Sequence, residues 1–103
     1  MKVAKFGGSS LASSDQVRKV VKIIKDDPMR RYIVVSAPGK RHTDDIKVTD
    51  LLISLHDNLV AGKDPSRLIN AIYNRYEEIG QAFHVDKQIL TDIYQDLTSL
   101  KTI

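Results

Sequence analysis

A lysine, two glycines and two serines stand close together near the N-terminus, in a pattern suited to holding a phosphate group. Residues 5–10 read Lys-Phe-Gly-Gly-Ser-Ser and directly follow the apolar pair Val3-Ala4. Because glycine has no Cβ, the backbone N–H groups of Gly7 and Gly8 can approach an anion closely. Lys5 adds a compact charge that can neutralise a phosphoryl group during its transfer. The pattern is neither a Walker A loop nor the dinucleotide-binding G-x-G-x-x-G.

The segments on either side give this motif the setting that a phosphate loop needs. Lys2–Phe6 predicts a short buried strand, and Ser13 and Gln16 have the spacing of a capping box at the start of a helix. The first N–H groups of a helix lack partners and carry a partial positive charge, which favours anions. A tight turn without a ligand is the alternative interpretation of Gly7-Gly8.

The first half of the chain predicts a βαβ unit. A helix with apolar residues at helical spacing extends from Ser13 or Ser14 to about Lys25, before Asp27-Pro28. Tyr32–Ser36 is a continuous apolar run, as expected for a strand that is covered on both faces. Strand, helix and strand in this order should give a right-handed unit with parallel strands.

After the polar loop Ala37–Lys47 the pattern becomes helical. From Thr49 onward we expect three helices, of which the first ends near Ala61-Gly62, the second begins at Asp64-Pro65, and the third is capped by Asp86. Their apolar stripes are Leu51, Leu52, Leu55 and Leu59; Leu68, Ile69, Ile72, Tyr73, Tyr76, Ile79 and Phe83; and Ile89, Leu90, Ile93, Tyr94, Leu97 and Leu100.

The composition excludes several classes of function. The 103 residues are 42% hydrophobic and 28% charged, with a net charge of +3 and no cysteine, so disulfides and thiolate sites are excluded. No apolar run approaches the ~20 residues that span a bilayer. Lysine and arginine are scattered and form no basic stripe. We therefore expect a cytoplasmic protein that binds neither nucleic acid nor membrane.

Three stretches, in order, resemble one family. Lys5–Ser10 is similar to the N-terminal signature of aspartate kinases, a branch of the amino-acid kinase family. Ile33–Gly39 resembles their second strand with its Ser-Ala loop, and Lys47–Leu52 resembles the start of the next helix. The resemblance covers essentially the whole chain, although the last forty-odd residues match only in helical character. It implies an α/β fold, the N-terminal portion of a three-layer α/β/α sandwich with an incomplete sheet.

The resemblance also implies a reaction. Aspartate kinases transfer the γ-phosphoryl group of ATP to the side-chain carboxylate of L-aspartate, with Mg²⁺, in the first step of lysine, threonine and methionine biosynthesis. Lys5 would be catalytic and contact the transferred phosphoryl group. Gly7 and Gly8 would offer amides to the phosphates of ATP, and Ser9 would lie at the phosphate or at aspartate.

Two further residues would contact aspartate by the same resemblance. Ser36 ends the second predicted strand, at the sheet edge where ligands of α/β proteins bind; its alternative role is a turn residue. Thr49 opens a helix, and its alternative role is a plain N-cap, although a cap can also bind substrate.

No metal ligand is assigned. The three histidines lack the spacing of a ligand set, and the neighbouring acidic residues correspond to loop residues in the family. These residues are His42, His56, His84, Asp44, Asp45 and Asp50.

The organisation predicts a fragment of a longer enzyme. Two parallel strands rarely make a stable sheet, and the last predicted helix reaches Ile103 without a stop signal. We expect a partial catalytic domain, with a βαβ part over 1–48 that holds the phosphate loop and a helical part over 49–103. The rest of the catalytic domain and the ACT domains would be absent, and the piece alone inactive. An exposed sheet edge predicts a homo-oligomer.

The sequence leaves two alternatives to an aspartate kinase. Kinases that act on glutamate, carbamate or nucleoside monophosphates share the fold but generally lack this combination of motifs. A non-catalytic helical interaction or oligomerisation module is the other alternative, and it predicts no response to Mg-ATP.

Overall fold

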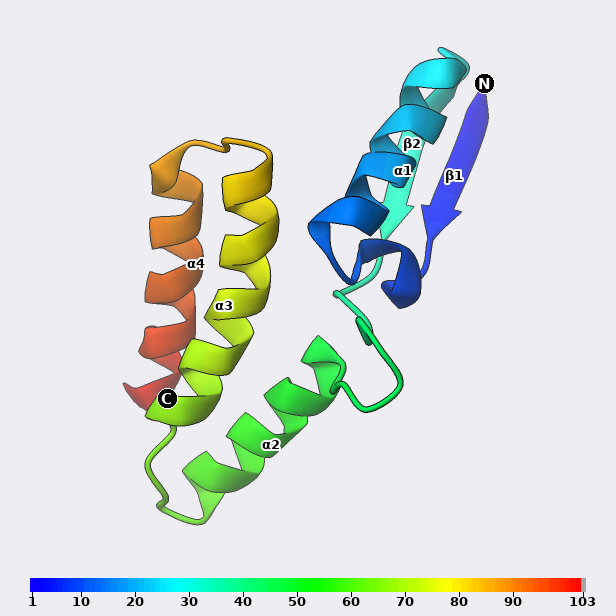
Figure 1. Ribbon diagram of the computed structural model, residues 1–103. Coiled ribbons are helices and arrows are strands. Elements are labelled where there is room, and N and C mark those ends of the chain that lie inside the picture. The colour runs from blue at the N-terminus through cyan, green and yellow to red at the C-terminus, as the bar shows by residue number, and fades with distance from the viewer. Residues whose placement is uncertain (103) are drawn as a thin grey trace. The chain divides into compact units, whose positions relative to one another are not determined.

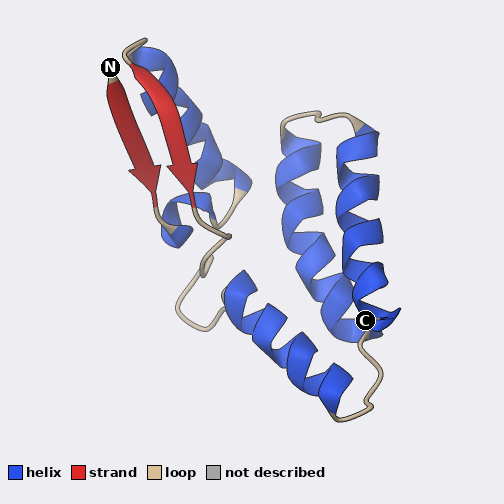
Figure 2. Ribbon diagram, turned by 180° about the vertical axis from the view of Figure 1, so that it is seen from behind, coloured by secondary structure: helices blue, strands red, loops and turns tan. Residues whose placement is uncertain are grey.

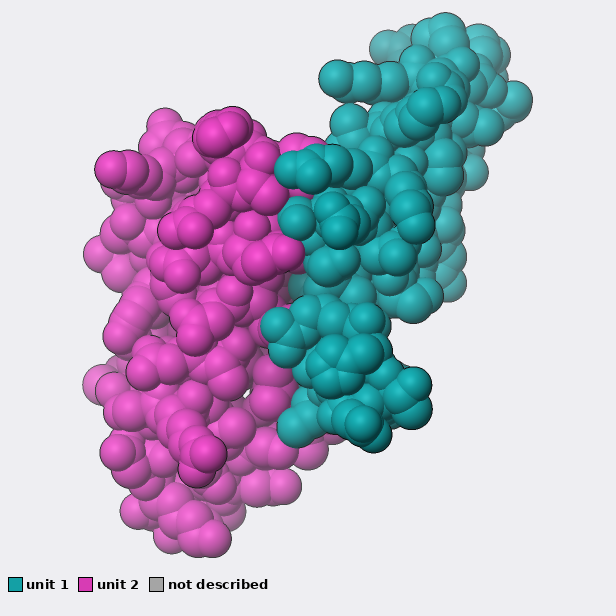
Figure 3. Space-filling model, in the orientation of Figure 1, with its two compact units in different colours: residues 1–47 teal, residues 48–103 magenta. Residues whose placement is uncertain are grey.

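The computed structural model describes residues 1–102 and contains two compact units, one from Met1 to Lys47 and one from Val48 onward (Figure 3). The first unit consists of β1 (Lys2–Phe6), the 3₁₀ turn η1 (Gly8–Leu11), α1 (Ser14–Asp26) and β2 (Arg30–Val35). The second consists of α2 (Val48–Val60), α3 (Ser66–Ala82), α4 (Lys87–Ser99) and the 3₁₀ turn η2 (Leu100–Thr102) (Figure 1).

The first unit is a βαβ unit, as predicted. β1 and β2 pair in parallel, with Val3 opposite Tyr32 and Phe6 opposite Val35. The helix α1 lies along one face of this two-stranded sheet (Figures 1 and 2). Side chains alternate between the two faces of a strand. Phe6 is buried, as is Val20 of α1, whereas Val3 and Lys5 are exposed. Phe6 therefore faces α1, and Val3 and Lys5 lie on the open face.

The second strand differs from the prediction in its bounds and in its burial. β2 covers Arg30–Val35 instead of Tyr32–Ser36, and Tyr32, Val34 and Val35 are 57%, 49% and 58% exposed. The first unit has a single long helix to cover its sheet. The expectation that β2 is covered on both faces is therefore wrong for the described residues.

Polar contacts fix the connection between α1 and β2. The Arg30 guanidinium donates a hydrogen bond to the carbonyl of Ile23 in the last turns of α1. Lys2 Nζ lies 2.7 Å from Asp27 Oδ2, and the Met29 N–H donates to the other carboxylate oxygen. Both contacts favour the ionised carboxylate and hold the pKa of Asp27 below its usual value. The turn before β2 is thus bonded to β1, and the start of β2 is bonded to α1.

The second unit packs part of each predicted stripe into a core, whereas the stripe residues Leu52, Ile89 and Tyr94 are exposed. Its buried apolar side chains are Val48, Leu51, Leu55, Ile69, Ile72 and Leu97. The helices α3 and α4 lie side by side (Figures 1 and 2). The rings of Tyr73 and Tyr94 are tilted at 58° with centroids 5.1 Å apart, within the range of favourable aromatic pairs. A Cβ at Gly80 would lie 2.9 Å from a methyl carbon of Leu90, so the two helices approach closely there.

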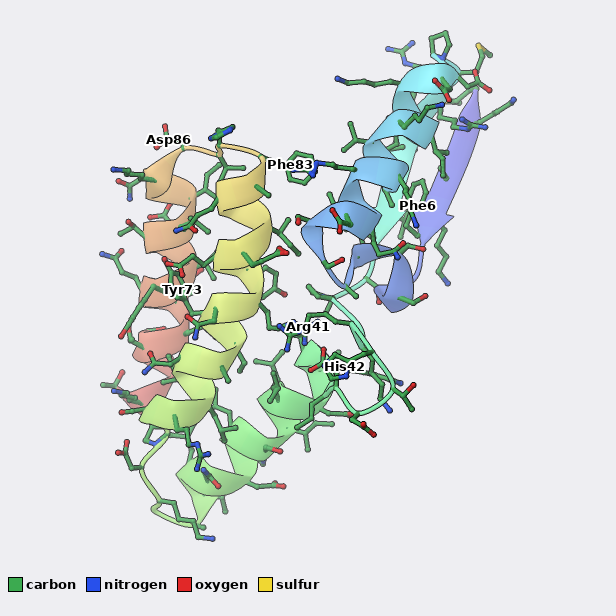
Figure 4. The ribbon with its side chains drawn as sticks, in the orientation of Figure 1. Phe6, Arg41, His42, Tyr73, Phe83 and Asp86 are labelled. Atoms are coloured by element: carbon green, nitrogen blue, oxygen red, sulfur yellow. The ribbon has the colours of Figure 1, made fainter. Side chains whose placement is uncertain are left out.

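Aspartates begin α3 and α4. Asp86, labelled in Figure 4, accepts a hydrogen bond from the Gln88 N–H at 2.9 Å, which confirms the predicted cap. Asp64 accepts from the Ser66 N–H at 3.0 Å, and its bonds to Ser66 hold the pKa of Asp64 below its usual value. Pro65 is the N-cap of α3. The sequence predicted it one position later, as the first helical residue.

The helices α2 and α3 end in the same hydrogen-bonded pattern, a Schellman motif with one residue in the left-handed region. At the end of α2 that residue is Gly62, with φ +72°, and at the end of α3 it is His84, with φ +52°. The hydrogen bonds are Lys63 N–H to Asn58 O at 2.8 Å, Gly62 N–H to Leu59 O at 3.2 Å, Val85 N–H to Gly80 O at 3.0 Å and His84 N–H to Gln81 O at 3.2 Å. Glycine adopts this conformation freely, and other residues are strained in it.

Two substitutions at these motifs are expected to have opposite effects. His84→Gly should raise the free energy of unfolding by about 1 kcal/mol, and Gly62→Ala should lower it by about as much, because only glycine adopts positive φ without strain. A Cβ at Gly62 would meet nothing within 4 Å, so the effect there comes from the backbone alone. Urea denaturation followed by circular dichroism measures both. A change of the same sign in the two variants would contradict this account.

Candidate phosphate-binding site

Lys5 and Ser36 lie at the carboxyl ends of the two strands. Lys5 pairs with Val34 across the ladder and is exposed on the sheet face opposite α1. The Ser36 N–H donates to the carbonyl of Phe6 at 3.2 Å, so the ladder continues one residue past β2. Because side chains alternate, Ser36 falls on the same face as Val34 and Lys5. The structure thus brings these two predicted site residues to one edge and one face.

The glycine loop is a short turn and does not lead directly into a long helix. Gly7 is extended, with φ −78° and ψ 176°, and Gly8 begins η1. The Ser10 N–H donates to Gly7 O at 3.1 Å and closes this turn. Ser13 is the N-cap of α1, but its side chain makes no capping hydrogen bond, so the predicted capping box is wrong. Any amides offered to an anion here belong to the loop and η1, because α1 begins only at Ser14.

The two glycines of the motif differ in their surroundings. A Cβ at Gly8 would lie 3.1 Å from the carbonyl oxygen of Ala37, so the loop after β2 packs against it. A Cβ at Gly7 would meet nothing within 4 Å. Gly7 also has backbone angles that any residue adopts. Packing within the described chain thus explains a glycine at position 8 and does not explain one at position 7.

Gly39, which the sequence did not mark as a candidate, contacts the glycine loop. Its N–H donates to Gly8 O at 2.7 Å, and both Gly39 and its neighbour Pro38 are buried. The Pro-Gly pair marked a turn, but a turn signal carries no information about which distant residue the turn touches.

The loop beyond Gly39 is held by an ion pair between Arg41 and Asp45. Arg41 Nε and an Arg41 terminal nitrogen lie 2.6 and 3.0 Å from the two Asp45 oxygens, and the Arg41 backbone N–H donates to the same carboxylate. Figure 4 labels Arg41 and His42 in this loop. The Asp45 carboxylate is therefore engaged. Within residues 1–102 the structure shows no group of three or more potential ligands for a metal ion.

The remaining predicted residues lie on turns and helix ends. Ser9 is exposed in η1, beside Gly8. Thr49 is exposed in the first turn of α2, in the second unit. Because α2 begins at Val48, Thr49 is its second residue, and the alternative that Thr49 is the N-cap is wrong by two residues. The site that the structure assembles in the first unit consists of Lys5, the Gly7–Ser9 loop and Ser36, with Gly39 added.

Comparison with known proteins assigns the chain to a family. The sequence profile of the amino acid kinase family matches residues 1–101. The chain belongs to this family. It is 45% identical over 100 residues to aspartokinase 3 of Bacillus subtilis, spanning 97% of this chain and 22% of that one. It is 29% identical over 99 residues to a putative inactive aspartokinase 3 of Haemophilus influenzae, spanning 96% of this chain and 67% of that one.

Solved structures of this family share the fold. The aspartate kinase of Clostridium acetobutylicum superimposes with a TM-score of 0.82 at 40% identity, over 92% of this chain and 23% of that one. E. coli aspartokinase III in complex with aspartate and ADP gives a TM-score of 0.74 at 25% identity, over 97% and 21%. The α/β fold expected from the sequence is thus confirmed. The chain spans about a fifth of the length of these enzymes.

No helix within residues 1–102 is both long enough and apolar enough to cross a membrane.

Proposed function

We propose that this chain is the phosphate-binding N-terminal part of an aspartate kinase, which transfers the γ-phosphoryl group of ATP to the side-chain carboxylate of L-aspartate and forms 4-phospho-L-aspartate. The observation that carries the proposal is the 45% identity to an aspartokinase over nearly the whole chain. A solved relative that binds aspartate and ADP supports the choice of substrates.

Lys5 and the Gly7–Ser9 loop would hold the phosphates. Both reactants are anionic, so the site must lower their repulsion and align them, mainly by positioning and electrostatics. The exposed Lys5 ammonium at the end of β1 would neutralise the transferred phosphoryl group. The open space over Gly7 leaves room for an oxygen to reach its backbone, where a side chain would stand in the way. This gives a functional reason for a glycine that packing does not explain.

Ser36 and Thr49 would contact aspartate. Ser36 shares the sheet edge and face of Lys5, where the acceptor carboxylate must meet the phosphoryl group. Thr49 would donate its hydroxyl from the first turn of α2, where the N-terminus of a helix favours a carboxylate. Mg²⁺ would arrive with the phosphates of ATP, since Mg²⁺ is usually held by phosphates and one or two carboxylates. No ligand for it is assigned within the described residues.

A chimera tests the proposal. The chain would replace the matching 100-residue segment of B. subtilis aspartokinase 3, and the acyl phosphate formed from aspartate and ATP would be trapped with hydroxylamine. We expect activity that depends on both substrates. A folded chimera that binds ATP but forms no acyl phosphate, while the parent enzyme does, would contradict the proposal.

A non-catalytic module is the second candidate. It is favoured by the similarity to a relative described as inactive, of which the chain spans 67%. Exposed apolar side chains on α2, such as Ile53 and Val60, would then be its partner surface. This candidate predicts that the 103-residue chain self-associates and that its amide spectrum does not respond to Mg-ATP or aspartate. Cytoplasmic location and homo-oligomeric assembly stay predictions of the sequence.

A further inference from the structure

We infer that Gly39 is a positioning residue of the phosphate loop, because it fixes the orientation of the Gly8–Ser9 peptide group and with it the direction of the Ser9 N–H. The consequence that we draw from it, that the Ser9 N–H points at a phosphate oxygen, rests on the proposed function. The contact itself can be tested without any ligand.

The first observation is a hydrogen bond. The Gly39 N–H donates to the Gly8 carbonyl oxygen at 2.7 Å. In a planar trans peptide group the C=O and the N–H point in opposite directions. The bond that holds the Gly8 oxygen toward Gly39 therefore turns the Ser9 N–H away from Gly39. As long as the bond exists, the peptide group cannot rotate freely.

The second observation is the close contact of Gly39 with the same peptide group. A Cβ at Gly39 would lie 2.7 Å from Gly8 C, 2.9 Å from Gly8 O and 2.9 Å from Ser9 N. These three atoms are backbone and have no rotamer with which to move aside. A side chain at Gly8, the other residue of the contact, would be less crowded, since a Cβ there would meet its nearest neighbour at 3.1 Å. Gly39 is thus the residue of the pair that tolerates a side chain least.

The loop that carries Gly39 is anchored on both sides. Before it, the Ser36 N–H is bonded to Phe6 O at 3.2 Å, which continues the sheet ladder. After it, the Arg41–Asp45 ion pair closes the chain into a compact turn. A methyl group at Gly39 would therefore displace the Gly8–Ser9 peptide group, which lies in the partly exposed turn η1, more readily than its own loop.

The consequence is a preorganised donor. Catalytic sites stabilise developing charge best with donors that need no reorientation during the reaction. A hydrogen bond to a charged group is stronger than one between neutral groups. We expect that Gly39→Ala weakens the binding of Mg-ATP roughly tenfold or more, since ~1.4 kcal/mol corresponds to a factor of ten.

The ligand-free experiment uses the ¹⁵N,¹³C-labelled 103-residue chain. The scalar coupling across the hydrogen bond, between the Gly39 nitrogen and the Gly8 carbonyl carbon, should be detectable in the wild type, and Gly39→Ala should shift the Ser9 amide signal. Gly62→Ala is the matched control, because it makes the same change in the second unit, where a Cβ meets nothing within 4 Å. It should leave Ser9 unshifted. Absence of the coupling overturns the inference even if Gly39→Ala does not fold.

Titration with Mg-ATP supplies the functional readout. In the wild type the Ser9 amide should shift on binding, and in Gly39→Ala that shift should be lost and the Kd raised roughly tenfold, with Gly62→Ala binding as the wild type does. A folded Gly39→Ala chain with unchanged Ser9 shift and Kd overturns the inference. If the wild type itself does not respond to Mg-ATP, the isolated chain does not bind the nucleotide, the chimera decides the proposed function, and the coupling between Gly39 and Gly8 still decides the positioning.

Discussion

Lys5→Met in the chimera is expected to lower kcat for acyl phosphate formation by about 10²–10³-fold, the usual loss when a group that stabilises transition-state charge is removed. KM for ATP should change much less, because the Lys5 charge would act mainly on the phosphoryl group in transfer. Methionine keeps an unbranched side chain at an exposed position of β1, so the fold should persist. Steady-state kinetics with aspartate and ATP varied separately measure both constants.

Lys2 provides a matched control for Lys5. It is an exposed lysine on the same strand, but it lies at the opposite end of β1, where its ammonium pairs with Asp27. Lys2→Met should leave kcat and KM unchanged. If Lys5→Met instead raises KM for ATP as much as it lowers kcat/KM, the lysine binds ground state and transition state alike, and the catalytic role proposed for it is wrong.

Periodicity predicted most of the fold because it reports local burial. β1 was predicted at its observed bounds, Lys2–Phe6, and α1 and α2 begin and end within a residue or two of the expected positions. The helix α4 begins directly after its predicted cap but ends at Ser99, whereas the sequence predicted a helix that reaches Ile103. Turn chemistry marked the helix ends, as at Asp86 and Gly62. These signals lie within a few residues of the structure that they specify.

Features that depend on distant residues could not be predicted in this way. The contact between Gly39 and Gly8 joins two loops across the ends of two strands, and neither loop carries a sign of the other. The sequence therefore provided no reason to connect Gly39 with the first loop, although it placed that loop and Ser36 at the same end of the sheet. The left-handed conformation of His84 was equally hidden, because it is imposed by the Schellman motif and not favoured by histidine.

Burial of β2 shows the limit of composition as a guide. Its apolar run is typical of a strand with both faces covered, yet Val34 and Val35 are about half exposed, at 49% and 58%. The residue types of a strand indicate whether it is suited to burial on both faces. Its actual exposure depends on which other elements are present to cover it. In the first unit a single long helix, α1, lies against the sheet (Figure 2).

The core of the second unit gives the other large expected effect. Ile72→Ala should lower the free energy of unfolding by about 2–5 kcal/mol, because Ile72 is 1% exposed and its loss leaves a cavity. Ile53→Ala is the matched control on a neighbouring helix. Ile53 is 60% exposed, so this change should stay within about 0.5 kcal/mol. Urea denaturation monitored at 222 nm compares the two variants, and similar losses would contradict the assignment of the core.

The same pair of variants separates the two candidate functions. If the helices form a partner-binding module, Ile53→Ala should weaken self-association of the chain without changing its stability, as seen by sedimentation velocity over a range of concentrations. If the chain serves a kinase, Ile53→Ala in the chimera should leave kcat unchanged, whereas Ile72→Ala should reduce the amount of folded enzyme and not the kcat of the part that folds. The buried side chains of α3 would then support the fold, whereas the reaction would depend on the loop beside Gly39 in the first unit and on Thr49 in the second.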